Sequence, residues 1–171
     1  MGVMSSLRRW WLKIYIKMVS EKATPEYIAR GWATGMFYGC MIPFGFQLIL
    51  SIPTSFLIKG SKIGATLGTL ITNHFTIFII YPIQCYIGNK IIGGSLNYCD
   101  IKQAMSDVIR NQDYSTLFGM SVDLIISFFV GGALITAVMT PLTYILVKKL
   151  VSIRQERKKI KQEKVNNGFE K

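Results

Sequence analysis

The chain has 171 residues, of which 50% are hydrophobic and 17% are charged, and its mean hydropathy is +0.35. These values exclude an ordinary soluble domain and are typical of a membrane protein. The net charge of +11 is concentrated at the two ends. Residues 1–30 hold six Lys or Arg and two acidic residues, and residues 148–171 hold nine and three. By the positive-inside rule, both termini are therefore expected in the cytoplasm.

The N-terminal segment, residues 1–22, is expected to lie on the inner leaflet of the membrane. Arg9, Lys13 and Lys17 follow one another at intervals of four residues, with two adjacent tryptophans beside Arg9. This is the pattern of a basic interfacial helix with aromatic anchors. Because its basic and apolar residues are mixed, the segment lacks the continuous apolar stretch of a signal peptide, and we expect it to be retained.

Three segments without charged residues, 31–58, 63–89 and 124–147, contain 28, 27 and 24 residues. Each is long enough to cross or enter a bilayer, since a span needs about 20 mainly apolar residues. Two cytoplasmic termini require an even number of crossings. One of the three segments must therefore enter the membrane and return, or split into two spans.

The polar regions complete a membrane domain over residues 23–150. Thr24 as an N-cap and Pro25 at the first helical position predict its first helix. The loop 90–123 has few basic residues and is expected to be external, with a short amphipathic helix within it. The basic tail 151–171 is expected to continue the last span as a helix at the membrane surface. Its basic residues lack interleaved aromatics, so nucleic acid is not an expected partner.

Pro43 and Gly45 interrupt the most apolar stretch of the chain, "GCMIPFGFQ". Pro43 removes a backbone donor and Gly45 permits a tight reversal, so a bend is expected at residues 43–45. The two arms would measure roughly 18–20 Å, which is too short to cross a core of about 30 Å. A re-entrant hairpin fits these lengths, with Gln47 near its tip.

The alternative is a single kinked helix over 31–58, because proline is common in transmembrane helices. The segment 63–89 would then have to supply the return. In either case the expected fold is all-α and membrane-embedded. It comprises an N-terminal interfacial helix, a Gly/Pro-broken re-entrant hairpin, about two full transmembrane helices and a basic helical tail.

Small residues recur every four positions in two of these segments. One series runs through Gly31, Gly35 and Gly39, and the other through Gly64, Gly68 and Thr72. Each series puts small residues on one helical face, which permits close backbone approach. We expect the two faces to pack directly against each other rather than to mark an internal repeat.

Catalytic and metal-binding patterns are lacking in the sequence. Cys40, Cys85 and Cys99 show no ligand spacing, and His74 is the only histidine. All nine acidic residues lie outside the three apolar segments, so His74 has no evident second ligand there. We therefore expect no metal, no cofactor and no enzymatic activity.

The stretch "TPEYIARGWATGMFYGCMIPFGFQ", followed by "GATLGTLITNHFT", resembles the bacterial membrane family called domain of unknown function 2062. The family pattern is P-x-x-I-A-x-G-x-A-x-G-x-F-x-G-x-x-P-x-x-G-x-Q, then G-T-x-x-x-N-P-x-T. Its positions are occupied here by Pro25, Ile28, Ala29, Gly31, Ala33, Gly35, Phe37, Gly39, Pro43, Gly45, Gln47, Gly68, Thr69, Asn73 and Thr76. His74 departs from the pattern by replacing the usual proline, and Lys59-Gly60 stands where Arg-Asn is common.

The resemblance implies a bacterial inner membrane but no assigned activity. Similar domains are sometimes fused to glycosyltransferases that use lipid-linked sugars, which implies cell-envelope chemistry and an envelope glycosyltransferase as one protein partner. If the chain forms a pathway, it is short enough that we expect a homo-oligomer.

Two functions compete. The first is a transporter or permease-like protein for an anionic lipid or envelope precursor such as polyprenyl phosphate. The second is a non-transporting membrane scaffold that anchors an envelope enzyme. For the first, the candidate substrate-binding residues are those of an intramembrane polar niche with a basic residue at its cytoplasmic edge, namely Arg30, Pro43, Gly45, Gln47, Asn73, His74 and Thr76.

Overall fold

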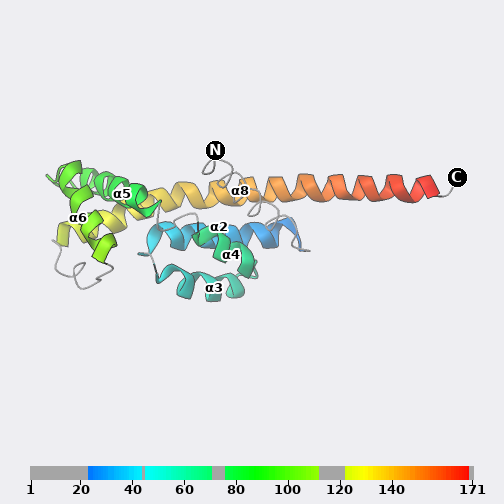
Figure 1. Ribbon diagram of the computed structural model, residues 1–171, viewed down its shortest axis with the longest axis horizontal. Helices are drawn as coiled ribbons and strands as arrows, with labels where there is room; N and C mark the ends of the chain where they lie inside the picture. Colours follow the sequence, from blue (N-terminus) through cyan, green and yellow to red (C-terminus); the bar gives the residue numbers. More distant parts are fainter. Residues whose placement is uncertain (1–22, 44, 71–75, 112–121, 170–171) are drawn as a thin grey trace, which may run out of the picture.

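The computed structural model describes residues 23–43, 45–70, 76–111 and 122–169, and within them every regular element is a helix (Figure 1). The predicted interfacial helix, residues 1–22, lies outside the described residues. The helices are α2 (Pro25–Met41), α3 (Gln47–Leu57), α4 (Lys62–Thr69), α5 (Ile77–Ile91), α6 (Tyr98–Asn111) and α8 (Val122–Phe169).

The predicted start of α2 and the predicted break after it are both confirmed. The hydroxyl of Thr24 accepts a hydrogen bond from the Tyr27 amide at 3.3 Å, and Pro25 is the first helical residue. At the other end, Ile42 is extended, with φ −111° and ψ 138°, as expected for a residue before proline. Gly45 has φ +106°, a conformation that L side chains rarely adopt, and α3 begins two residues later.

The chain reverses at this break, so that α2 and α3 form an antiparallel helical hairpin. The hydroxyl groups of Tyr38 and Thr54 are 2.9 Å apart, and Arg30 Nη1 donates to the carbonyl oxygen of Ile58 at 3.4 Å. These residues pair across the break, whereas a kinked helix would keep them far apart. The backbone therefore folds back on itself instead of forming one kinked helix, whereas its re-entry into a membrane stays a prediction.

The predicted packing of the two glycine faces is confirmed as a contact between α2 and α4. A Cβ atom added to Gly35 would collide with the carbonyl oxygen of Ala65 and lie 2.8 Å from the Cα of Gly68. Gly31 meets the backbone of Ser61 in the same way, so α4 runs parallel to α2. Thr72, the last member of the second series, lies outside the described residues.

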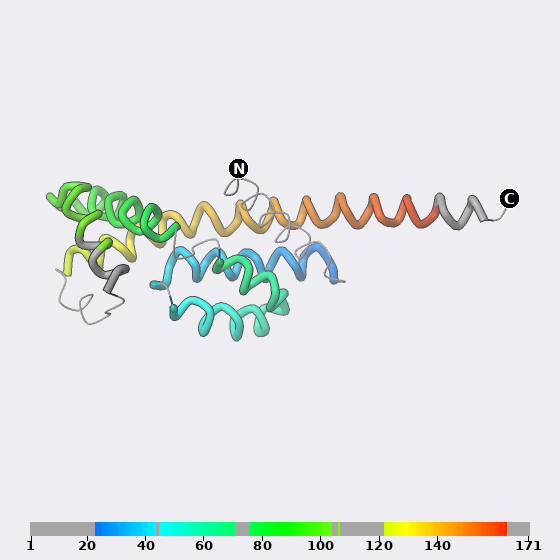
Figure 2. The backbone as a smooth tube through the Cα atoms, in the orientation of Figure 1, coloured from blue at the N-terminus to red at the C-terminus, as the bar shows by residue number. Residues whose placement is uncertain are grey.

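The long helix α8 packs against α2 and α5, on which the remaining helices pack in turn. Its middle part lies antiparallel to α2, where Lys148 Nζ is 3.0 Å from Glu26 Oε1. Its N-terminal part lies antiparallel to α5, where Gln84 Nε2 donates to the Phe128 carbonyl oxygen at 2.9 Å. The helices α2 and α5 consequently follow one another along α8 (Figure 2).

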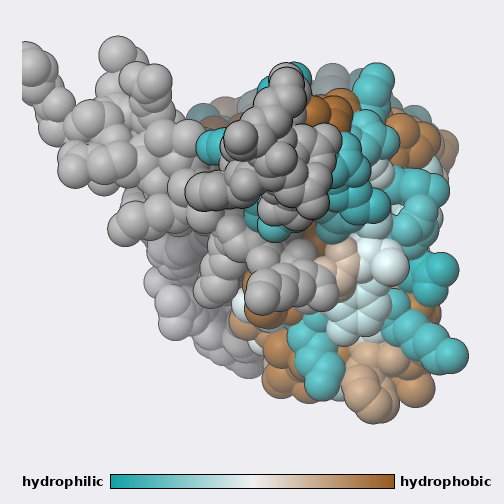
Figure 3. All heavy atoms as spheres, turned by 90° about the vertical axis from the view of Figure 1, so that its right-hand side faces the viewer, coloured by the Kyte–Doolittle hydropathy of each residue, from teal (hydrophilic) through white to brown (hydrophobic). Residues whose placement is uncertain are grey.

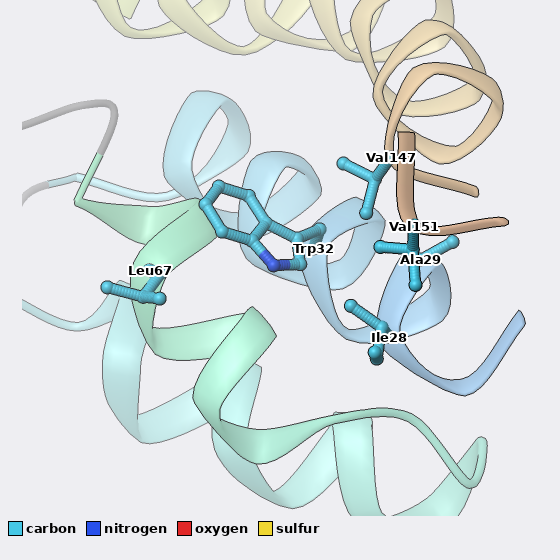
Figure 4. Close-up of a cluster of buried hydrophobic side chains, with 6 residues drawn as sticks. All are labelled: Ile28, Ala29, Trp32, Leu67, Val147 and Val151. Carbon is cyan, nitrogen blue, oxygen red and sulfur yellow. The ribbon is translucent and has the colours of Figure 1, made fainter. Parts of the chain in front are cut away.

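Two clusters of buried side chains correspond to these two parts of α8. One lies between α2, α4 and α8, with the Trp32 ring between Leu67 on one side and the α8 valines on the other (Figure 4). The second lies between α5, α6 and α8, where the rings of Tyr81 and Phe128 meet edge to face at 5.1 Å. The core is therefore divided along the length of α8.

One helix among the described residues, over Val122–Glu163, is long and apolar enough to cross a membrane, where the sequence suggested about two. The difference arises in segment 63–89, which α4 and α5 share as helices of 8 and 15 residues. Neither reaches the roughly 20 residues that a continuous span needs. The expected helix in the 90–123 loop is present as α6, and α8 continues through the basic tail as expected.

Candidate functional site

The helix α3 has the reverse of the side-chain distribution of a soluble protein. Its buried residues are Gln47, Ser51 and Ser55, which follow at intervals of four and form one polar stripe. Its exposed residues are large and apolar, with Ile49 66% exposed and Leu57 77% exposed. A helix with its polar stripe inside and its apolar face outside is favourable where an apolar environment, such as a bilayer or an apolar partner surface, covers the outer face.

Two helix breaks lie at nearly the same level along α8. The first, between α2 and α3, follows Cys40, whose carbonyl oxygen is 3.2 Å from a Cβ atom built on Gly132. The second lies between α4, which ends beside Gly35, and α5, which begins seven residues before Gln84. Both breaks are therefore within about two helical turns of Gly132, near the middle of the apolar segment 124–147.

A fully buried amide lies at that level. Gln84 has no exposed surface, and its Nε2 is 2.6 Å from the position that a Cβ atom on Gly132 would take. The side chain is thus held between α5 and α8, with the last turn of α2 beside it. Gln84 Oε1 is buried without a hydrogen-bond partner among the described residues.

The predicted site residues divide into two separate groups. Pro43, Gly45 and Gln47 lie at the α2–α3 break, where Gln47 is 3% exposed and the Pro43 carbonyl accepts from the Phe46 amide at 3.4 Å. Arg30 is exposed near the other end of α2, about 20 Å away along the helix.

Of the remaining predicted residues, Thr76 alone lies within the part of the chain that the structure describes. Thr76 is the N-cap residue of α5, and its carbonyl oxygen accepts from the Ile80 amide at 2.9 Å. Asn73 and His74 lie outside the described residues, so the predicted contact between Gln47 and the Asn73 stretch stays a prediction.

Several buried polar residues were not among the predicted site residues, namely Ser51, Ser55, Gln84, Ser127 and Thr136. The predicted site residues stand beside proline or glycine breaks, whereas these five lie within regular helix. A signal was available, because any amide or hydroxyl inside an uncharged segment of a membrane protein is a candidate for a buried partner. Which face of its helix each occupies could not be read without the packing.

Basic side chains gather at the end of the molecule where α8 leaves the bundle. Figure 3 views this end and shows hydrophilic side chains, with hydrophobic ones along the lower side, where α3 lies. Lys62 Nζ lies 4.9 Å from the centre of the Phe56 ring, and the exposed Lys59 has a positive φ of 53°. With Arg30, these residues surround the α3–α4 turn.

An ion pair between Glu26 of α2 and Lys148 of α8 also lies at this end. Its hydrogen bond lowers the pKa of Glu26 and raises that of Lys148, although both side chains are 43% exposed. Arg30, Lys59 and Lys62 form no ion pair in the part of the chain that the structure describes. Their charges are therefore available to an external anion.

The described residues contain no group of three or more His, Cys, Asp or Glu side chains arranged to hold a metal ion. No curated protein and no solved structure matches the chain. Residues 8–159 match the family described as uncharacterized protein conserved in bacteria (DUF2062), and this match covers most of the 171 residues. The chain therefore belongs to the bacterial family of domain of unknown function 2062.

Proposed function

We propose that this chain is a small multi-pass protein of the bacterial inner membrane that binds, and moves in a permease-like manner, an anionic amphiphile of the cell envelope. The amphiphile class comprises anionic phospholipid and polyprenyl phosphate. The observation that carries the membrane placement is the inverted helix α3, with Gln47, Ser51 and Ser55 inside and apolar side chains outside. An apolar environment accounts for this arrangement, whereas water does not.

In this placement the α2–α3 hairpin enters from the cytoplasmic side and returns. Helices α4 and α5 cross together as one broken span, and α8 crosses back. The two crossings put both termini on one side, in agreement with the positive charge at the ends of the chain. The hairpin arms, of 17 and 11 residues, meet at the level from which α8 continues toward the external side beside α5.

Impermeant thiol labelling of intact cells tests this topology in a variant without native cysteines. A single cysteine introduced at Asn166 is expected to stay unlabelled until the cells are opened. A single cysteine introduced at Lys102, which is exposed on α6, is expected to react at once. Labelling of the Asn166 position in intact cells would refute the placement.

The proposed ligand site lies at the α3–α4 turn. Arg30, Lys59 and Lys62 present three cationic groups at the expected membrane surface, and Arg30 can form paired hydrogen bonds to a phosphate. The exposed apolar face of α3 begins beside them, with Phe56 66% exposed. A phosphate held by this turn would therefore have its hydrocarbon chain against α3.

Native mass spectrometry of protein extracted with its lipids tests the ligand. We expect an anionic phospholipid or polyprenyl phosphate to copurify, and the triple variant R30Q/K59Q/K62Q to lose most of it. A matched control with the same change in charge is K158Q/K159Q/K161Q, since those lysines are exposed on the projecting part of α8. Equal loss in both variants would mean non-specific attraction and would contradict a site.

A scaffold that anchors an envelope enzyme, such as a glycosyltransferase, is the second candidate. The close backbone packing of Gly31 and Gly35 against α4 favours it, because such a contact suits a rigid anchor. Under this alternative the same spectra would show lipids in the proportions of the bulk membrane, and cross-linking in cells would recover the enzyme through the projecting end of α8.

A further inference from the structure

Helices α2, α5 and α8 meet at a junction that we define by Cys40, Gln84, Gly132 and Thr136. Cys40 contributes its backbone carbonyl, which lies in the last turn of α2. Carbonyl groups in the last turn of a helix have no amide donor from a following turn. Gln84 brings its amide from α5, and Gly132 leaves the room that both occupy. The partial negative charge of a helix C-terminus is thus directed at the buried amide.

Polar atoms at and beside this junction are buried without partners in the described part of the chain. They are Oε1 of Gln84 and the hydroxyl oxygens of Thr136 and Thr140. Gln84 is 0% exposed and Thr136 is 3% exposed, so neither side chain reaches the surface. An unpartnered polar atom away from water is destabilising, and these three lie within about two helical turns of one another along α8. A bound ligand that supplied the missing partner would remove that cost.

The three atoms lie on connected faces. Gly132, Thr136 and Thr140 follow at intervals of four on α8 and therefore share one face of that helix. Because side chains on a helix lean toward its N-terminus, the Thr136 hydroxyl leans toward Gly132 and hence toward Gln84. The Gln84 amide, the Thr136 hydroxyl and the Cys40 carbonyl oxygen thus all lie within about one helical turn of Gly132.

We propose that this junction binds a small monovalent cation, Na⁺ or K⁺, through the Gln84 amide oxygen, the Thr136 hydroxyl and the carbonyl oxygens that end α2. Neutral oxygens are the ligands that such ions use at broken membrane helices. The segments 31–58, 63–89 and 124–147 contain no carboxylate, which argues against a divalent ion, since those are usually bound through carboxylates. The inference rests on the proposed membrane placement but not on the identity of the lipid ligand.

The test is the thermal stability of the purified full-length protein in detergent, titrated with NaCl or KCl against N-methylglucamine chloride at equal ionic strength. We expect a saturable rise in Tm with one or both alkali cations, because a ligand that binds only the folded state stabilises it. No cation-specific rise would overturn the proposal.

Thr136→Val is the diagnostic variant, since valine keeps the shape of threonine and removes the oxygen. It is expected to weaken the apparent cation affinity by about tenfold or more while leaving Tm in N-methylglucamine chloride nearly unchanged. The matched control is Thr66→Val on α4, whose hydroxyl already donates to the Lys62 carbonyl at 3.0 Å and lies away from the junction. An unchanged cation response in Thr136→Val would refute the site.

Gln84→Glu is a second, independent test of the cation site. A carboxylate in place of the amide is expected to tighten cation binding and to make it pH-dependent, because protonation would remove the added charge. If Gln84→Glu does not fold, Thr140→Val replaces it, with a smaller expected loss of affinity. Loss of copurifying lipid in R30Q/K59Q/K62Q leaves the cation response intact, so failure of the ligand proposal and failure of this one are distinguishable.

Discussion

The α2–α4 contact and the α2–α5–α8 junction both bring backbones together at glycine, but they differ in how their hydroxyl and amide oxygens are satisfied. The indole Nε1 of Trp32, at the first, is also buried without a partner in the described chain, so the difference concerns oxygen atoms alone. At the first, the Ser61 hydroxyl accepts from the Gly64 amide at 2.8 Å and Thr69 donates to the Thr66 carbonyl at 2.8 Å. At the second, Gln84 Oε1 and the Thr136 hydroxyl are buried without partners in the described chain. Close glycine packing therefore indicates assembly, whereas unsatisfied oxygen atoms indicate a site.

The largest expected effect comes from adding a side chain where the backbones of α2 and α4 are in close contact. Gly35→Ala would place a Cβ atom against the Ala65 carbonyl, and since this neighbour is backbone, the helices must separate. We expect a loss of more than about 3 kcal/mol in the free energy of unfolding, measured by denaturation in detergent.

Gly93→Ala is the comparison for that variant. Gly93 has open space around it but a positive φ of 76°, so alanine is expected to cost only about 1–2 kcal/mol. Equal effects of the two substitutions would show that conformational strain, rather than helix contact, explains the Gly35 result.

A smaller loss is expected from removing a satisfied hydroxyl at the α2–α4 contact. Ser61→Ala deletes the cap of α4 and leaves the Gly64 amide unpaired inside the protein, at a cost of about 1–2 kcal/mol in unfolding free energy. Ser95→Ala, at an exposed position, is the control and should change stability by less than about 0.5 kcal/mol.

Removing an unsatisfied hydroxyl should have almost no effect on stability. Thr136→Val takes away a polar atom without breaking a described hydrogen bond, so we expect a change within about 0.5 kcal/mol in cation-free buffer. A loss as large as that of Ser61→Ala would show that the Thr136 hydroxyl has a structural partner, and the distinction between the two regions would fail.

The smallest effect is expected at the exposed ion pair that joins α2 to α8. The lowered pKa of Glu26 contributes stability above the ordinary carboxyl pKa of 4.5, which is lost as the pH falls through the folded-state value. The raised pKa of Lys148 contributes below 10.5, and that contribution is lost as the pH rises through its folded-state value. Glu26→Gln should therefore lower Tm slightly between these limits and not at all below them, as measured by thermal melts at several pH values. A larger loss at low pH would contradict this sign.

Local sequence determined the parts of the fold that depend on one or two residues. Pro43 and Gly45 were sufficient to predict the break, since one restricts the residue before it and the other permits a positive φ. Thr24 and Pro25 likewise predicted the start of α2. The four-residue spacing of glycines predicted the α2–α4 contact, because the helical repeat puts them on one face.

Tertiary structure alone decided which polar residues face inward and where the second apolar segment divides. Ser51 and Gln84 look like tolerated polar residues in the sequence, and only the positions of α2 and α8 put them inside the protein. The burial of Thr136 likewise could not be predicted from the sequence, because its neighbours come from helices that are distant in the chain. Periodicity identifies a face of a helix, but in a segment that is apolar on every side it does not say which face meets protein and which meets lipid.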